Sequence, residues 1–184
     1  MIRLSFSKPY ADLVARMRVP CGFLLIIAFA WLCRPTPLSL AMGLPVGLAG
    51  LAIRAWAAGH LEKNMRLAMG GPYAYVRNPL YIGTLVAATG FVIASRRWVL
   101  AALFATVFFL VYLPVIELEE QHLRRLFPEY TSYAASVPAL IPGRRAKGEH
   151  GAFRWSRYLR NEEYQAALGF AGGTAWLVAR MLWF

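Results

Sequence analysis

Five long stretches of this 184-residue chain contain no Asp, Glu, Lys or Arg, and this feature limits the fold more than any other. The stretches are residues 19–33, 35–53, 78–95, 98–116 and 164–179. A helix needs about 20 residues to cross the hydrocarbon core of a bilayer, and shorter helices are tolerated when the bilayer thins. Hydrophobic residues make up 59% of the chain and charged residues 16%, which departs from the usual soluble balance. We therefore predict an all-α polytopic membrane bundle of about five transmembrane helices and exclude a water-soluble enzyme.

The 20 Lys and Arg residues orient this predicted bundle. If the N-terminus is cytoplasmic, only Arg34, Arg96 and Arg97 fall on the far side, and most other basic residues fall on the cytoplasmic side. Cytoplasmic loops of membrane proteins are enriched in Lys and Arg, so we predict a cytoplasmic N-terminus. The net charge of +11 then reflects topology first and attraction to anionic membrane lipids second. No nucleic-acid-binding motif accompanies the charge, so no nucleic acid partner is predicted.

The whole chain, residues 1–184, is predicted to be one domain, and residues 1–59 form its first part. Residues 1–18 set apolar residues among basic ones, which predicts a short interfacial helix. Two prolines within residues 34–37 prevent a continuous helix, so the first two stretches are predicted to form a tight antiparallel hairpin. Glycines in the second stretch predict a ridge that lets a neighbouring helix approach closely. They are Gly43, Gly47 and Gly50.

Residues 60–142 carry the candidate site, and residues 143–184 hold a basic interfacial segment and the last span. A second tight hairpin is predicted at residues 95–98, and a helical continuation is predicted over residues 117–126. Three residues at helical spacing predict an amphipathic surface helix after residue 150. They are Trp155, Tyr158 and Leu159.

Cys21 and Cys33 both lie in the first apolar stretch, without a His or acidic cluster nearby. We interpret them as apolar thiols in a membrane helix, and we predict neither a disulfide nor a metal site. The first stretch also lacks a small-residue cleavage signature, so it is predicted to be retained as a span.

Residues 71–83, with the sequence GPYAYVRNPLYIG, form the most informative segment. Its glycines and prolines predict a rigid loop that brings Arg77, Asn78 and tyrosine hydroxyls to the mouth of the third stretch. Glu117, Glu119 and Glu120 follow the fourth stretch and fall on the same predicted side. Crowded carboxylates near a bilayer need cationic or hydroxyl-rich partners. A bound ligand can supply these partners, and so can arginines of the chain itself.

These residues resemble the isoprenylcysteine carboxyl methyltransferase family and its bacterial relatives, which share the pattern with phospholipid N-methyltransferases. The family pattern joins a G-P-Y-x-Y-x-R-H-P-x-Y-x-G loop to a later E-E pair and a V-P-x-x-x-P segment. Here the similarity covers about residues 54–142. It runs through Arg77, Asn78, Pro79, Leu80, Tyr81, Glu119, Glu120, Leu123, Phe127, Tyr130, Tyr133, Val137, Pro138 and Pro142.

The resemblance implies a methyltransferase of the bacterial inner membrane that uses S-adenosylmethionine in a cytoplasmic pocket and acts on a small lipophilic acceptor from the bilayer. It implies that Glu119 and Arg77 are catalytic, with Arg77 pairing the cofactor carboxylate and the two glutamates accepting from its hydroxyl and ammonium groups. The cofactor-binding positions it implies are His60, Leu67, Ala68, Tyr73, Arg77, Asn78, Pro79, Leu80, Tyr81, Glu119 and Glu120.

Two positions depart from the family pattern. Asn78 replaces the usual His and cannot act as an acid or base, so no general catalysis is predicted there. Val115 stands where eukaryotic prenylcysteine enzymes have an Arg, which argues against prenylcysteine as the acceptor. Arg54, Arg124 and Arg125 are the alternatives for binding an acceptor carboxylate.

Two other functions remain open from the sequence. Membrane sterol reductases resemble this family around the same loop, so an NADPH-dependent reductase is one alternative, although the chain is short for it. The other is a non-catalytic membrane protein that retains the fold as a binding or assembly module.

Overall fold

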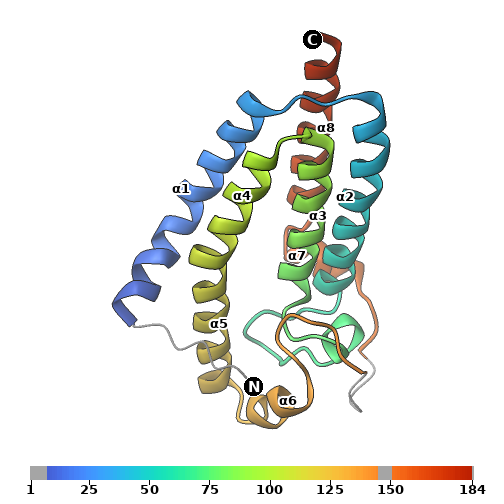
Figure 1. Ribbon diagram of the computed structural model, residues 1–184. Coiled ribbons are helices and arrows are strands. Elements are labelled where there is room, and N and C mark those ends of the chain that lie inside the picture. The colour runs from blue at the N-terminus through green and yellow to red at the C-terminus, as the bar shows by residue number, and fades with distance from the viewer. Residues whose placement is uncertain (1–7, 145–150, 184) are drawn as a thin grey trace.

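The computed structural model describes residues 8–144 and 151–183, and these residues confirm the predicted all-α fold (Figure 1). A 3₁₀ helix, η1 (Gly71–Ala74), lies in the loop after α2, and a π-helical segment, η2 (Phe108–Tyr112), joins α4 to α5 without a break. The α-helices are α1 (Lys8–Leu32), α2 (Pro37–Ala58), α3 (Pro79–Ser95), α4 (Trp98–Val107), α5 (Leu113–Leu126), α6 (Tyr130–Ser136), α7 (Trp155–Arg160) and α8 (Tyr164–Trp183).

Two helices are long and apolar enough to cross a membrane: α2 and the continuous helix Trp98–Leu126 formed by α4, η2 and α5. Shorter apolar helices lie at Val19–Leu32, within α1, and at Pro79–Ser95, which is α3. Large apolar side chains also face outward from the bundle, including Trp31, which is 80% exposed, and Trp98, which is 89% exposed. The bundle of about five transmembrane helices therefore stays a prediction. Among the described residues, two helices have the length and composition needed to span a membrane.

The predicted glycine ridge of α2 is confirmed, and α3 is the helix that packs on it. A β-carbon added at Gly50 would lie 2.3 Å from the backbone nitrogen of Ala87, and one added at Gly43 would lie 2.4 Å from the carbonyl oxygen of Gly90. The two backbones are therefore in direct contact. Because α3 begins at the candidate loop and α2 ends beside it, this contact fixes the frame of the site.

The sequence prediction was wrong about how α1 packs. Residues 8–18 form the first turns of one helix that continues through Pro20 to Leu32, so they are no separate interfacial helix; residues 1–7 lie outside the described residues. After the short turn, α1 and α2 diverge, and α1 packs against α4, η2 and α5 instead. The glycine ridge of α2 is occupied by α3, whereas α1 finds an apolar face around Val111 and Val115.

The short turns and the long loops lie at opposite ends of the bundle (Figure 1). At the short-turn end, Thr36 caps α2 by accepting from the backbone N–H of Ser39, and Ser39 Oγ donates to the carbonyl of Ala94 at 2.8 Å. Cys33 is buried there among apolar side chains, and both cysteines are free thiols. At the other end lie the connection 59–78 and the described residues 127–144 and 151–163, which include α6 and α7.

Candidate functional site

A buried ion pair joins the candidate loop to the acidic end of α5. Arg77 donates from Nε to Glu120 Oε1 and from Nη2 to Glu120 Oε2, each at 2.9 Å. Asn78 Nδ2 donates to the same Oε1 at 3.0 Å. The Arg–Asn–Pro turn and the glutamate pair therefore meet, as the sequence predicted, although 43 residues separate Arg77 from Glu120.

The same arginine also holds the segment that follows α6. Arg77 Nη1 donates to the carbonyl oxygens of Ala134 at 2.9 Å and Val137 at 2.7 Å. Burial alone would lower the pKa of Arg77, but the hydrogen bond and charge of Glu120 raise it overall, so the guanidinium stays charged. The Nε, Nη1 and Nη2 atoms of Arg77 thus all donate hydrogen bonds within the protein. Arg124 of α5 makes a longer contact of 3.8 Å with Glu120.

Backbone hydrogen bonds fasten the loop of residues 71–79 to the segment 133–143. Arg77 N–H donates to Pro138 O, and Gly143 N–H donates to Tyr75 O, each at 2.9 Å. The Tyr133 hydroxyl donates to the Tyr73 carbonyl at 2.7 Å. These bonds hold the two segments of the motif together in one layer at the loop end of the bundle.

A cavity of about 670 Å³ opens beside this layer, between α2, α3, α5 and the α7–α8 turn. We call it the main cavity. Nine of the residues predicted to bind a cofactor line it: Leu67, Ala68, Tyr73, Arg77, Asn78, Pro79, Leu80, Tyr81 and Glu119. The structure therefore brings most of the predicted set to a single hollow. Glu120 and His60 are outside its lining.

Glu119 and Tyr73 are two of the many polar residues that line the main cavity. Glu119 is exposed and lines the cavity, whereas its neighbour Glu120 turns inward to Arg77. Burial raises the pKa of the Tyr73 phenol above its usual range, and the nearby Tyr133 and Glu119 charges raise it further. The Tyr73 hydroxyl is therefore neutral at physiological pH and can donate or accept a hydrogen bond, but it is no base.

The sequence reasoning missed a second ion pair in the wall of the main cavity. Arg54 of α2 donates from Nε to Glu163 Oε1 at 2.5 Å and from Nη2 to Oε2 at 2.9 Å. Its Nη1 donates to Thr84 Oγ1 at 2.6 Å. This pair, with the Thr84 hydrogen bond, joins α2, α3 and the turn before α8. The sequence signal for it was Arg54 itself, a lone cation at the end of an apolar stretch, which needs a buried acidic partner.

His60 lies away from the main cavity and lines a smaller neighbouring one. Its Nδ1 lies 2.8 Å from the carbonyl oxygen of Trp56, which can only accept, so Nδ1 carries the proton. The ring packs over Gly71, whose φ of +57° and lack of a side chain both suit this contact. Among the described residues, no group of three or more His, Cys, Asp or Glu is arranged to hold a metal ion.

Residues 46–130 match the phospholipid methyltransferase family, and this range includes the candidate loop and both glutamates. The match covers a little less than half of the chain. The matched residues provide α3, α4 and α5 complete and most of the residues that line the main cavity.

Two curated bacterial proteins are similar to the chain. The cobalt-zinc-cadmium resistance protein CzcN of Cupriavidus metallidurans is 36% identical over 110 residues, which is 58% of this chain and 50% of that protein. The nickel-cobalt-cadmium resistance protein NccN of Alcaligenes xylosoxydans xylosoxydans is 36% identical over 105 residues, which is 54% of this chain and 49% of that protein. The chain thus matches about half the length of each relative. No solved structure is significantly similar to it.

Proposed function

We propose that the chain is an integral-membrane methyltransferase that uses S-adenosylmethionine and methylates a small lipophilic acceptor, namely a carboxylate, amine, thiol or lipid headgroup. The observation that carries this proposal is the main cavity, whose walls are the motif residues of the family domain. A cavity of about 670 Å³ lies within the range of known small-molecule sites and accommodates a drug-sized molecule.

The lining fits the chemistry of the cofactor. S-adenosylmethionine supplies, when bound, a methyl group that its cationic sulfonium already activates. Glu119 offers a carboxylate for the cationic or hydroxyl groups of the molecule, and the Tyr73 hydroxyl lies near it. Leu80 and Tyr81 supply apolar and aromatic walls. No side chain needs to act as a nucleophile, so orientation and exclusion of water are the tasks left to the protein.

In this proposal Arg77 positions the site and does not bind the cofactor directly. Its guanidinium already holds Glu120 and two backbone carbonyls, so its donors are committed within the protein. The pair fixes the turn at Asn78 and Pro79, which line the cavity. The cofactor role first predicted for Glu120 likewise becomes a positioning role.

Membrane embedding is part of the same proposal. Two helices have the length and composition to cross a bilayer, and outward-facing side chains such as Ile26 and Phe109 are more than half exposed. Lipid is the solvent that such a surface requires. The loop end, where the main cavity opens, also receives most of the basic residues, so the positive-inside rule places it in the cytoplasm. We therefore propose that cofactor enters from the cytosol and the acceptor from the bilayer.

Calorimetry with the purified protein in detergent tests this function. We expect S-adenosylmethionine and its demethylated product to bind with micromolar affinity and NADPH to give no heat above buffer. Binding of NADPH alone would favour the reductase, and absence of both would favour a binding or assembly module. Incubation with methyl-labelled S-adenosylmethionine and bacterial membrane extract, followed by mass spectrometry, then identifies the acceptor.

A further inference from the structure

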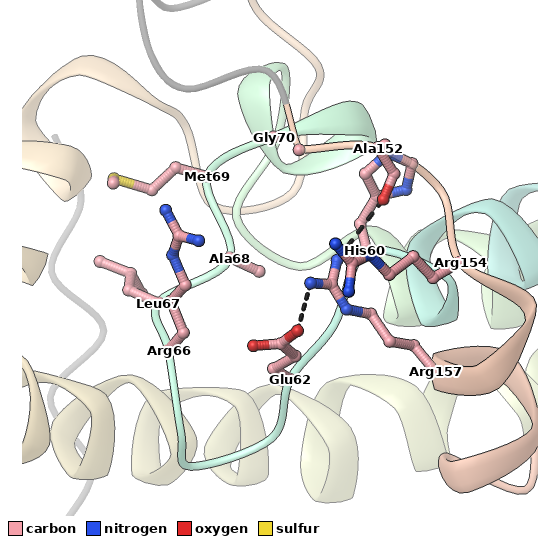
Figure 2. A pocket seen from close by; sticks show the side chains of 11 residues that line it. His60, Glu62, Arg66, Leu67, Ala68, Met69, Gly70, Ala152, Arg154 and Arg157 are labelled. Carbon is pink, nitrogen blue, oxygen red and sulfur yellow. Dashed lines mark hydrogen bonds and ion pairs between the residues drawn. The ribbon is translucent and has the colours of Figure 1, made fainter.

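A smaller cavity of about 390 Å³ lies beside the main cavity, and we call it the arginine cavity (Figure 2). The loop of residues 60–70 forms one side, and residues 151–157 form the other. The two cavities share the wall formed by Glu62, Arg66, Leu67 and Ala68. Of the residues predicted to bind a cofactor, only His60, Leu67 and Ala68 line the arginine cavity. The cofactor prediction therefore does not explain the arginines of this cavity.

The arginine cavity is strongly basic. Arg66 approaches from the loop, Arg154 from the residue before α7 and Arg157 from within α7 (Figure 2). Among the described residues that line it, Glu62 is the one carboxylate. Like charges crowded around a hollow repel one another, so the guanidinium groups of Arg154 and Arg157, with one carboxylate among the described lining residues, favour occupation by an anion.

Arg157 has hydrogen-bonding capacity that the protein does not use. Its Nη2 pairs with Glu62, and its Nη1 donates to the carbonyl of Ala152 at 3.4 Å. Its Nε is buried and has no hydrogen-bond partner among the described residues. A buried guanidinium donor without a partner is costly, and an oxyanion that displaces Glu62 from the Nε and Nη2 edge would accept from both nitrogen atoms.

The position of the arginine cavity relative to exposed apolar side chains indicates the kind of anion. On α7, Trp155 is 68% exposed and Leu159 is 57% exposed, and Phe153 before the helix packs on Gly59. Aromatic and apolar side chains beside arginines are typical of the interface between headgroups and acyl chains. A free anion needs no such apolar surface, whereas a lipid uses both features.

We propose that the arginine cavity binds the phosphate of an anionic membrane phospholipid, with the acyl chains lying along the exposed face of α7. Arg154 and Arg157 bind the phosphate oxygens, as guanidinium groups do in a bidentate manner. Glu62 competes with the phosphate for Arg157, so it limits the affinity. The arginine cavity is a second site, and its test does not depend on methyl transfer in the main cavity.

Native mass spectrometry of the detergent-purified full chain tests the inference with four short-chain probes. They are dioctanoyl-phosphatidylglycerol, dioctanoyl-phosphatidylcholine, dioctanoylglycerol and inorganic phosphate. We expect one phosphatidylglycerol to be retained, with at least tenfold tighter binding than the zwitterionic lipid, and no retention of dioctanoylglycerol. Equal binding of dioctanoylglycerol, or saturation by inorganic phosphate at the concentration that saturates with lipid, would overturn the lipid assignment.

Substitutions in the arginine cavity test which side chains bind the phospholipid. Arg154→Gln removes an exposed guanidinium, so folding is retained, and we expect at least a tenfold loss of phosphatidylglycerol affinity. Glu62→Gln removes the competing carboxylate, and we expect tighter binding. Arg125→Gln removes the same charge from an exposed site on α5 outside both cavities, and its affinity should equal the wild-type value. Unchanged affinity in Arg154→Gln, or weaker binding in Glu62→Gln, would refute the site.

Discussion

The Arg77–Glu120 ion pair is the most consequential interaction of two residues in this protein. Both side chains are less than a tenth exposed, and together they tie the candidate loop, α5 and the segment after α6. Removing one partner of a buried pair leaves the other charge uncompensated, which costs about 3–5 kcal/mol. We therefore expect Glu120→Ala to lower the thermal unfolding midpoint strongly, as measured by tryptophan fluorescence in detergent.

The matched control for Glu120 is Glu129→Ala, which removes an exposed carboxylate at the start of α6. Surface substitutions usually change stability by less than about 0.5 kcal/mol, so its midpoint should stay near that of the wild type. If Glu120→Ala were as stable as this control, the pair would have no structural role and Glu120 would return to the set of ligand-binding candidates.

Glu119 should show the opposite behaviour from its neighbour. Its carboxylate is exposed and lines the main cavity, so it is placed to bind ligand and contributes little to folding. We expect Glu119→Gln to weaken S-adenosylmethionine binding by at least tenfold in calorimetry because a charged acceptor is lost. Its unfolding midpoint without ligand should match the wild type. Full affinity in the variant would remove Glu119 from the cofactor site.

The contact between α2 and α3 leads to a prediction for whole elements. A β-carbon at Gly90 would lie 2.4 Å from the backbone nitrogen of Gly47, so Gly90→Ala must push the two helices apart. Overpacking of this kind costs about 1–3 kcal/mol. Gly169 on α8 has no atom within 4 Å of the same added carbon. In thermal unfolding, we expect a lower midpoint for Gly90→Ala than for the wild type, and a midpoint for Gly169→Ala that is not lowered in this way. Equal midpoints for the two variants would contradict the close packing of α2 and α3.

The element η1 and the helix α6 carry three tyrosines whose pKa values lie above the usual range. Burial is the main cause for Tyr73, Tyr130 and Tyr133 alike. The unfolded chain releases these protons near pH 10, whereas the folded protein retains them, so the free energy of unfolding decreases as the pH rises above 10. In spectrophotometric titration at 295 nm, we expect Tyr133→Phe to leave the phenolate absorbance of the folded protein at pH 11 unchanged. A loss of absorbance would show that Tyr133 ionises normally.

At the scale of elements, the sequence predicted what depends on local pattern. The glycine spacing on α2 predicted a close helix contact, and the prolines at residues 34–37 and the turn at 95–98 predicted the helix ends. It did not predict that α1 packs against α4 and α5, because an evenly apolar helix carries no signal for its partner. Membrane helices lack a polar face that would orient them, so their neighbours are decided by shape.

Across the whole molecule, the pairing of charges was the part that the sequence could not supply. The family pattern predicted that the loop and the glutamates share a site, but it assigned both glutamates to the cofactor and Glu119 to catalysis as well. Only the structure separates Glu120, which pairs with Arg77, from Glu119, which lines the main cavity. Arg54 and Glu163 are 109 residues apart, and no local pattern connects them.

The orientation of the whole molecule in the membrane decides whether the main cavity is supplied from the cytosol. Glu129 lies at the loop end, and Arg97 lies at the short turn before α4 at the opposite end. In intact cells, a membrane-impermeant maleimide should label Arg97→Cys above the wild-type background of Cys21 and Cys33, and it should label Glu129→Cys only after the membrane is opened.

The reverse labelling pattern would place the loop end outside the cytoplasm, where S-adenosylmethionine is not supplied. Labelling of both positions in intact cells would mean that the bundle does not separate its two ends by a bilayer. The basic residues at the loop end favour the first pattern, because moving them across the membrane is opposed by the rule that retains Lys and Arg on the cytoplasmic side. A cytoplasmic loop end brings the main cavity, the arginine cavity and the inner-leaflet headgroups to one side of the membrane.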